Sequence, residues 1–343
     1  MSNRLNDEIK MYSAIEKELI NYPDYIIDWY YNLKANEHSA TTCRDWINKI
    51  KQFLLFINPK INNVKLDDFS SDVVTKYFIK IQTKNEIVNG TEIYTKTSDS
   101  YRQCIWSCLN NFFEFLSDKQ LINNPLVTAK IKRPSNKDLD RINKNRVLLT
   151  KEDFKNILNM VEYGTGSKKS KTYQAKYKNR DLSIMLLFMT TGIRRNALRE
   201  INIDDIDFLN GKLVVVDKGD KEHIYSLNNQ TLMVLKEWVN DRYFMLGGNN
   251  KEKALFVSRD LKRISGTSIA ELVDKYSSAA LGYHISPHKL RSGLASIMYE
   301  ETKDIEFVRR IIGHSNVKTT QRYIVTNNSE RERATALMEN ILA

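Results

Sequence analysis

A change of pattern between residues 130 and 146 constrains the fold of this 343-residue chain more than any other feature. Before it, apolar residues recur at helical spacing. Within it, Pro134 interrupts the periodicity, and Lys and Arg outnumber Asp and Glu. After it, helical segments alternate with a β pattern. Because a chain of this length suits two domains, we predict a helical domain over 1–133, a basic linker over 134–149 and a mixed domain over 150–343.

The first domain is predicted to consist of helices alone. Pro23 suits the first turn of one helix, and Ser39 suits the N-cap of another that ends before Pro59. A third helix is expected around Val74 and a fourth from about Ser98, each with apolar residues three or four apart. Their aromatic residues are expected in the core. Their charged faces suit either an ordinary solvated surface or a small DNA clamp.

Cysteine usage and the apolar runs bear on the compartment. Cys43, Cys104 and Cys108 show no CxxC spacing, which argues against a disulfide framework or a zinc site. Cys104 and Cys108 lie four apart in an apolar helical pattern, so both are expected to be small core residues. The N-terminal segment lacks the apolar stretch of a signal peptide, and the densest apolar run, residues 184–189, is too short to span a bilayer. We therefore expect a cytoplasmic protein.

Helical signals open the second domain. Thr150 and Asp153 have the spacing of a capping box at the start of a helix. Residues 164–180 hold several Lys and Arg and no Asp or Glu, which suits either a phosphate-contacting loop or a disordered segment. Residues 181–189 are predicted to form a buried helix.

The β pattern follows and sets the fold class. Residues 206–209 are expected to form a strand that turns at Asn210-Gly211, the commonest two-residue hairpin turn. A second strand over 212–216 and a third over 223–227 complete the pattern, with a turn at 218–221 between them. Later segments are again helical. The predicted fold class is therefore mainly α with a small antiparallel β-sheet (α+β).

The charge of the chain favours a polyanionic partner. Lys and Arg total 53 against 42 Asp and Glu, which gives a net charge of +11 and a pI of about 9.3. Nucleic acid is the commonest polyanion for such a protein. Charge alone is also compatible with a protein that is merely basic, so the motifs have to decide.

Three dispersed runs carry side chains suited to chemistry on a phosphodiester. They are Thr191 to Arg194, His288 to Arg291, and Gly313 to Tyr323. Breaking a phosphodiester places charge on the phosphoryl oxygens, and an arginine guanidinium can hold two of them at once. The chain has no HExxH run, paired-carboxylate metal site or Walker-type phosphate loop. The residues therefore favour a route without metal, ATP or another cofactor.

The positions of the candidate residues are predicted from local signals. His288 and Arg291 lie three apart on a predicted helix that Ser286 would cap, near its positive end. Gly313 suits the end of the following helix, so His314 would emerge there. Taken singly, each of these residues is also compatible with a structural or surface role.

Together, these segments resemble the tyrosine recombinase family, also called the lambda-integrase or Xer-type recombinases. The resemblance rests on TGIR over 191–194, DKGDKEH over 217–223, HKLR over 288–291 and IGHSNVKTTQRY over 312–323. One departure stands out, because the family usually has an acidic residue three positions after the first arginine and this chain has Ala197. The resemblance implies a helical core-binding domain followed by a tyrosine-recombinase catalytic domain.

The resemblance also implies a mechanism. Tyr323 would attack the scissile phosphate and form a 3′-phosphotyrosyl bond, Lys218 would protonate the leaving 5′-oxygen, and His288 would act as acid or base beside the tyrosine. Lys221 is the competitor of Lys218 on the same predicted turn. The remaining implied catalytic residues hold the non-bridging oxygens, and they are Arg194, Arg291 and His314.

The implied partners are double-stranded DNA recombination sites and other copies of the chain. The family acts as a homo-tetramer on two DNA sites, and a helix at about 328–342 would dock on a neighbouring protomer. A type IB topoisomerase-like enzyme that relaxes DNA is the alternative enzyme, and a DNA-binding architectural protein is the alternative without catalysis. The size of the chain and the segment after Tyr323 favour recombination over relaxation.

Overall fold

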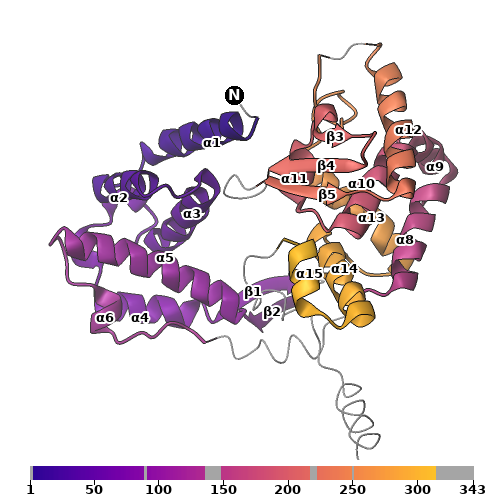
Figure 1. The fold of residues 1–343 in the computed structure, drawn as a ribbon. Helices are drawn as coiled ribbons and strands as arrows, with labels where there is room; N and C mark the ends of the chain where they lie inside the picture. The colour runs from indigo at the N-terminus through magenta and orange to yellow at the C-terminus, as the bar shows by residue number, and fades with distance from the viewer. Residues whose placement is uncertain (1–2, 89–90, 136–147, 217–221, 249–250, 314–343) are drawn as a thin grey trace, which may run out of the picture. The chain divides into compact units, whose positions relative to one another are not determined.

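The computed structural model describes residues 3–88, 91–135, 148–216, 222–248 and 251–313. The predicted helix at 328–342 and most of the predicted linker lie outside these ranges. The chain divides into two compact units, Met1–Ile142 (unit 1) and Asn143–Ala343 (unit 2), whose helices and strands are labelled in Figure 1. The fold class is confirmed, because helices dominate and the strands form small antiparallel sheets.

Unit 1 is built mainly of helices whose first turns are capped by serines. Ser39, Ser70 and Ser98 each accept a hydrogen bond from a backbone N–H in the first turn of the helix that follows. The helices are α1 (Asn3–Leu19), α2 (Asp24–Ala35), α3 (Ala40–Ile57), α4 (Ser71–Lys80), α5 (Asp99–Asp118) and α6 (Pro125–Thr128), with short 3-10 turns at Ile61–Asn63 and Leu66–Asp68.

Aromatic packing forms the core of unit 1. Trp29 is fully buried, stacks on Trp46 with ring centroids 6.0 Å apart, and donates a hydrogen bond from Nε1 to the Asn111 Oδ1 atom over 2.9 Å. Phe112 meets Trp29 edge-on at 5.2 Å. The expectation that the helical aromatic faces form a core is therefore confirmed.

The prediction that unit 1 contains only helices is wrong. Strands β1 (Thr83–Val88) and β2 (Thr91–Lys96) pair antiparallel between α4 and α5, with Thr83 opposite Lys96 and Val88 opposite Thr91. The residues between the strands in the sequence are Asn89-Gly90, the dipeptide typical of tight hairpins. This signal was available, but it was outweighed by the helical periodicity on both sides.

The cysteine prediction is correct for one residue of the pair and wrong for the other. Cys108 is buried, as is Cys43, whereas Cys104 is exposed. At this level of α5 the neighbouring Ile105 carries the buried face, and the core side of the helix continues through Cys108 and Leu109. Cys104 therefore lies at the margin of the apolar stripe and not within it.

Unit 2 surrounds a buried helix. Helix α10 (Lys178–Thr191) packs against four others and is buried along most of its length, as predicted for residues 181–189. Figure 1 shows these helices beside the three-stranded sheet of unit 2. The other helices are α8 (Lys151–Tyr163), α9 (Lys168–Ala175), α11 (Arg195–Glu200), α12 (Asn229–Met245), α13 (Gly266–Leu281), α14 (Pro287–Thr302) and α15 (Ile305–Ile311), with a 3-10 turn at Ile203–Asp205.

At the start of unit 2, the predicted capping box is confirmed and the prediction for residues 164–180 is wrong. The capping box is confirmed, because Thr150 and Asp153 exchange hydrogen bonds of 2.8 and 3.1 Å at the start of α8. The basic stretch over 164–180 is neither a loop nor disordered, because most of it forms α9 and the first turn of α10. Ser167 caps α9, and the Gln174 side chain bonds both backbone groups of Thr165, which fixes the segment.

The sheet of unit 2 has the order β3-β4-β5, with β3 at Ile206–Asp207, β4 at Lys212–Val216 and β5 at Glu222–Ser226. The first strand is shorter than predicted, because the Asp207 carboxylate accepts hydrogen bonds from the backbone N–H groups of Leu209 and Asn210. Asp207 lies opposite Lys212, so four residues turn the chain instead of two. Of the helices that the structure describes, none is long and apolar enough to cross a membrane.

Candidate active site

Helix α14 positions two of the candidate residues. Ser286 caps the helix and Pro287 occupies its first turn, as predicted. His288 is exposed in that turn, and Arg291, three residues later, is only 2% exposed. The two residues therefore share one side of the helix start, with the imidazole in contact with solvent and the guanidinium enclosed by protein.

The Arg291 guanidinium joins three distant segments of unit 2. One of its terminal nitrogens donates to the backbone carbonyl of Gly192, and the other donates to the backbone carbonyl of Ile312. Gly192 ends α10 and Ile312 ends α15, so both acceptors are carbonyls at helix C-termini. A cation is favourable at such ends because the helix dipole is negative there. Arg291 thus ties together the TGIR, HKLR and IGH segments.

Glycine is required in the turns that follow both helices. Gly192 and Gly313 have φ angles of +64° and +63°, in the left-handed region that other residues rarely adopt. A Cβ atom at Gly192 would lie 3.1 Å from Leu294 Cδ2, and one at Gly313 would lie 2.9 Å from His223 Cε1. The first turn leads to Arg194, and the second directly precedes His314, which lies outside the described residues.

Arg194 begins the helix that follows the first turn. It is the N-cap of α11, with φ −73° and ψ 144°, and its side chain is half-buried. The first turn of α11 contains no acidic residue. Ala197, which replaces the acid usual in the family, is buried in the core of unit 2. No carboxylate from that position therefore accompanies Arg194.

Tyr225 is a site residue that the sequence reasoning missed. It lies on β5, is 9% exposed, and its hydroxyl lies close to the guanidinium groups of Arg291 and Arg194. Burial raises the pKa of Tyr225, while the two guanidinium groups act in the opposite direction. Its hydroxyl therefore stays neutral at physiological pH and can accept a hydrogen bond from a guanidinium. The alternation of β5 was the available signal, because it places Tyr225 on the same face as His223.

The described part of the site contains two guanidinium groups, those of a buried Arg291 and a half-buried Arg194. Arg194 begins α11, His288 and Arg291 lie in the first turns of α14, and Tyr225 of the sheet lies near the two arginines. Fixed donors in such a place can hold an anion whose charge grows during a reaction. In the described ranges, no group of three or more His, Cys, Asp or Glu side chains has the arrangement to hold a metal ion.

Three of the six predicted catalytic residues lie outside the described ranges. Lys218 falls in the segment between β4 and β5, and His314 and Tyr323 fall after residue 313. Lys221, the competitor of Lys218, also lies outside the described ranges. Their roles stay predictions from the sequence.

Comparison with known proteins identifies relatives of this chain. Residues 148–330 match the profile of the phage integrase family. The tyrosine recombinase XerC of Caldanaerobacter subterraneus subsp. tengcongensis is 31% identical over 229 residues, which are 66% of this chain and 59% of that protein. XerC of Histophilus somni is 34% identical over 145 residues, or 42% of this chain and 48% of that protein. The chain thus spans about half to three fifths of the length of these relatives.

Solved structures share the fold. The XerH site-specific recombinase bound to palindromic difH substrate, in a post-cleavage complex, matches with a TM-score of 0.62 at 18% identity, covering 89% of this chain and 82% of that one. A lambda integrase (residues 75–356) dimer bound to a COC′ core site matches with a TM-score of 0.60 at 17% identity, covering 86% of this chain and 96% of that one.

Proposed function

Since the chain belongs to the phage integrase family, we propose that it is a site-specific recombinase that cuts and rejoins double-stranded DNA without metal or ATP. The observation that carries this proposal is the Arg291 bridge. It brings the turn before Arg194 and the turn before His314 to the same guanidinium. These motifs are far apart in the sequence, and their convergence is what a single phosphate-binding site requires.

In the proposed reaction, the phenol oxygen of Tyr323 attacks the scissile phosphorus. A bond forms between that oxygen and the 3′-phosphate, and the bond from phosphorus to the 5′-oxygen breaks. Lys218 supplies the proton for the departing 5′-oxygen, and His288 takes the phenol proton. The exposed position of His288 at the start of α14 suits contact with DNA. The phosphotyrosyl bond conserves the energy of the broken bond, so rejoining needs no nucleotide.

The two arginines are proposed to hold the non-bridging oxygens together with His314. Arg291 enters this role already fixed by two carbonyls, which leaves little reorganisation when charge develops on the phosphate. We assign Tyr225 as a positioning residue that keeps Arg291 and Arg194 in place. In other members of the family, an acidic residue at the position of Ala197 helps to orient the arginine. In this chain the neutral hydroxyl of Tyr225 would do part of this.

The proposed assembly is a homo-tetramer on two DNA sites. A lambda integrase tetramer bound to a Holliday junction is among the solved structures with this fold, with a TM-score of 0.59 at 17% identity, covering 88% of this chain and 76% of that one. In the proposed assembly, the segment at about 328–342 docks on a neighbouring protomer. Cross-linking on DNA measures the number of copies, and a complex that never exceeds one copy per DNA would contradict this part.

The proposed function is tested by trapping the covalent complex. The purified chain selects binding sequences from a random duplex pool, and a selected duplex is then nicked near the expected cleavage point so that rejoining fails. We expect a protein–DNA adduct on denaturing gels, and we expect Tyr323→Phe to bind this DNA without forming the adduct. An adduct that persists in Tyr323→Phe would assign the nucleophile to another residue.

The topoisomerase alternative is separated by a second assay. A supercoiled plasmid without a selected site is incubated with the chain, and both relaxation and recombination are measured. A recombinase should leave this plasmid largely unchanged and recombine plasmids that carry two selected sites. Strong relaxation without recombinant products would favour the topoisomerase.

A further inference from the structure

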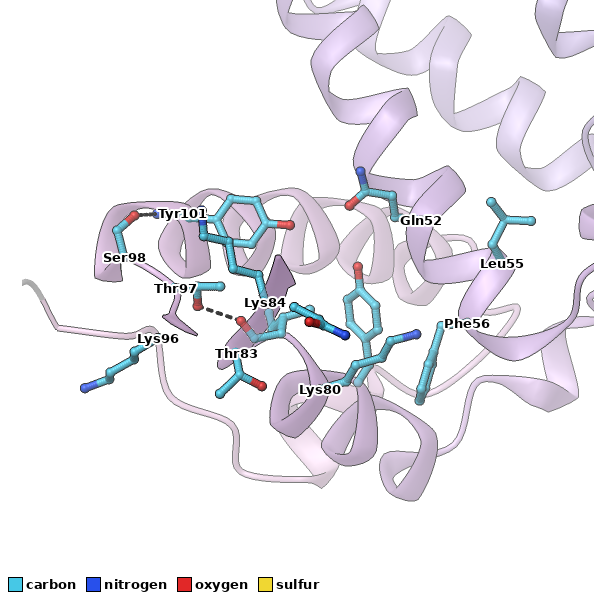
Figure 2. A pocket seen from close by; sticks show the side chains of 13 residues that line it. Gln52, Leu55, Phe56, Lys80, Thr83, Lys84, Lys96, Thr97, Ser98 and Tyr101 are labelled. Atoms are coloured by element: carbon cyan, nitrogen blue, oxygen red, sulfur yellow. Dashed lines mark hydrogen bonds between the residues drawn. The ribbon is translucent and has the colours of Figure 1, made fainter. Parts of the chain in front are cut away.

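A hollow lies at the base of the β1–β2 ribbon in unit 1. It has a volume of about 950 Å³ and is lined by residues of α3, α4, both strands and the start of α5. Figure 2 shows the side chains around it, including Phe56, Lys80 and Tyr101. The Lys80 ammonium lies 5.0 Å from the centre of the Phe56 ring. The hollow therefore offers apolar and aromatic surface with cations at its edge.

The charges around this hollow have one sign. Lys80, Lys84 and Lys96 line it, and no Asp or Glu is among the described residues that do. This is unusual for unit 1, because residues 1–142 carry 20 Lys and Arg against 18 Asp and Glu. A cluster of lysines in a nearly neutral unit indicates an anionic partner at this place.

The ribbon above the hollow exposes apolar side chains. Ile87 is 73% exposed and Tyr94 is 68% exposed, so neither contributes much to the core of unit 1. The register places Ile87 opposite Glu92 and Asn85 opposite Tyr94, so all four belong to one face of the ribbon. The Tyr94 hydroxyl and the Glu92 carboxylate lie 3.5 Å apart. This face combines apolar groups with side chains that can donate and accept hydrogen bonds.

The dimensions of the ribbon suit one groove of duplex DNA. Two paired strands lie about 5 Å apart, and a six-residue strand is about 20 Å long. The major groove is about 12 Å wide and admits a two-stranded ribbon, whereas the minor groove is about 6 Å wide. Asn85 suits the edge of adenine, Glu92 suits the amino group of cytosine, and Ile87 suits a thymine methyl group.

We propose that the β1–β2 ribbon reads a major groove of the target DNA while Lys80, Lys84 and Lys96 at its base hold the neighbouring phosphates. The inference rests on the proposed function, because it takes duplex DNA as the partner. The lysines favour DNA over a protein partner, because three cations around one hollow match the closely spaced phosphates of a DNA strand. The aromatic wall of the hollow suits the apolar face of deoxyribose.

The phosphate part is tested with Lys80→Ala, Lys84→Ala and Lys96→Ala combined. The probe is a duplex selected by the wild-type chain from a random pool, and the affinity is measured between 50 and about 300 mM salt. Each lost phosphate contact lowers the slope of log affinity against log salt by about 0.9, so the slope should fall by about 2 to 3. We expect at least about tenfold weaker binding near physiological salt.

A matched control removes three other lysines of unit 1. Lys34, Lys51 and Lys119 each form an ion pair with a carboxylate of the same unit, and replacing all three by Ala changes the net charge equally. This control should keep the salt slope within about 0.5 of the wild-type value, because it removes no phosphate contact. An equal fall in both triple variants would mean that net charge alone matters, which overturns the inference.

The groove-reading part is tested with Ile87→Ser and Tyr94→Ser combined. Both side chains are exposed, so the variant should keep its fold. We expect the preference for the selected duplex over a shuffled duplex to fall about tenfold or more, with the salt slope unchanged. Unchanged preference would overturn the inference, as would altered sedimentation of the free protein with normal DNA binding, which would indicate a protein partner instead.

The failure of this inference is distinguishable from that of the proposed function. The covalent adduct is measured in parallel with the wild-type chain and both ribbon variants on the nicked duplex. If the wild-type chain forms the adduct and the ribbon variants bind and select DNA as it does, only the ribbon inference fails. If the wild-type chain forms no adduct on any selected duplex, the proposed function itself fails.

Discussion

The two units differ in what they bury. Among the described residues, unit 1 buries two polar or charged side chains, Thr97 and Asp99, whereas unit 2 buries ten. Three of those in unit 2 are charged, and each has partners. Asp181 accepts from the Tyr276 hydroxyl over 2.8 Å, and Arg242 and Arg291 donate to backbone carbonyls.

Buried charges occur where the direction of a donor has to be fixed. Burying a charge is costly unless it is hydrogen-bonded, and an apolar residue fills the same space more cheaply. Unit 1 has a largely aromatic core, and Asp99, paired with Arg102, is the one charged residue that its described part buries. Unit 2 keeps a buried guanidinium beside its candidate site, where the direction of each donor matters for a phosphate.

The largest expected effect comes from destabilising one unit alone. Trp29→Ala removes the largest fully buried side chain of unit 1 together with its hydrogen bond to Asn111. We expect unit 1 to lose about 3 to 5 kcal/mol of unfolding free energy. Hydrogen exchange read by mass spectrometry should show faster exchange in unit 1 and unchanged protection in unit 2. Equal loss in both units would show that they fold as one.

A change in unit 2 should damage chemistry more than binding. Arg291→Ala removes the guanidinium that bonds Gly192 and Ile312. We expect single-turnover cleavage of the nicked duplex to fall about 100- to 1,000-fold, with a much smaller loss of DNA affinity. Arg291→Lys retains a charge but lacks the planar fork, so it should restore little activity. Full rescue by Lys would show that the bridge between the two carbonyls is dispensable.

Alkaline pH should lower the stability of the two units to different extents, because they differ in their buried tyrosines. Burial, helped by nearby carboxylates in three of the four cases, strongly raises the pKa of four tyrosines in unit 1, namely Tyr22, Tyr25, Tyr30 and Tyr77. In the described part of unit 2 only Tyr276 has its pKa raised as strongly.

The sign of the pH effect follows from these raised values. The stability linked to a raised pKa is complete below the unfolded value of about 10 and is lost as the pH rises from there towards the folded value. At pH 11 we expect unit 1 to lose about 2 to 4 kcal/mol and unit 2 to lose less. Urea unfolding at pH 8 and 11, followed separately in each unit, measures the difference. Greater loss in unit 2 would contradict the prediction.

The positioning role of Tyr225 predicts a smaller effect. Tyr225→Phe removes only the hydroxyl that meets Arg291. We expect cleavage to slow about tenfold, which corresponds to about 1.4 kcal/mol of transition-state stabilisation, while DNA affinity stays the same. A duplex with a methylphosphonate at the cleavage point carries no charge there. On this duplex, cleavage by Tyr225→Phe and by the wild-type chain should therefore differ less. An additional Ala197→Glu change should restore part of the rate, and a stability defect that leaves cleavage intact would rule out the positioning role.

The smallest expected effect concerns the cysteines of unit 1. Cys104 is exposed, whereas burial raises the pKa of Cys43 and of Cys108. Cys104→Ser should change the unfolding free energy by less than about 0.5 kcal/mol. A thiol reagent at neutral pH should label the native chain once, at Cys104. Fast labelling of Cys108 in the native protein would show that the core of unit 1 opens readily.

Much of the architecture was predictable because it depends on local signals. Ser39 and Thr150 cap the helices as predicted, and the helix expected from about Ser98 begins there, since an N-cap needs only its own side chain and the next turn. The β1–β2 ribbon and the helix over 168–175 were missed. In both places a short local signal lies within a longer segment whose overall pattern or composition indicates a different structure.

The candidate site was predictable as a set of residues but not as an arrangement. The motifs identify Arg194, His288 and Arg291, and the structure places all three within unit 2. That Arg291 is buried and bonded to two helix ends depends on contacts across 99 and 21 residues, which no local pattern contains. Tyr225 could not be predicted for the same reason, because its proposed positioning role depends on the side chains that lie beside β5 in the folded chain.

The two bonds of Arg291 have a consequence for how unit 2 can be divided. They close the chain from Gly192 to Ile312 into a loop fastened by one side chain, so the last turn of α15 and the end of α10 support each other. A fragment that stops before α15 would lack the Ile312 carbonyl. The turn at Gly192 would then lose part of its support as well. Supplying the missing C-terminal segment as a separate peptide would then have to rebuild a distant turn before it restored any activity.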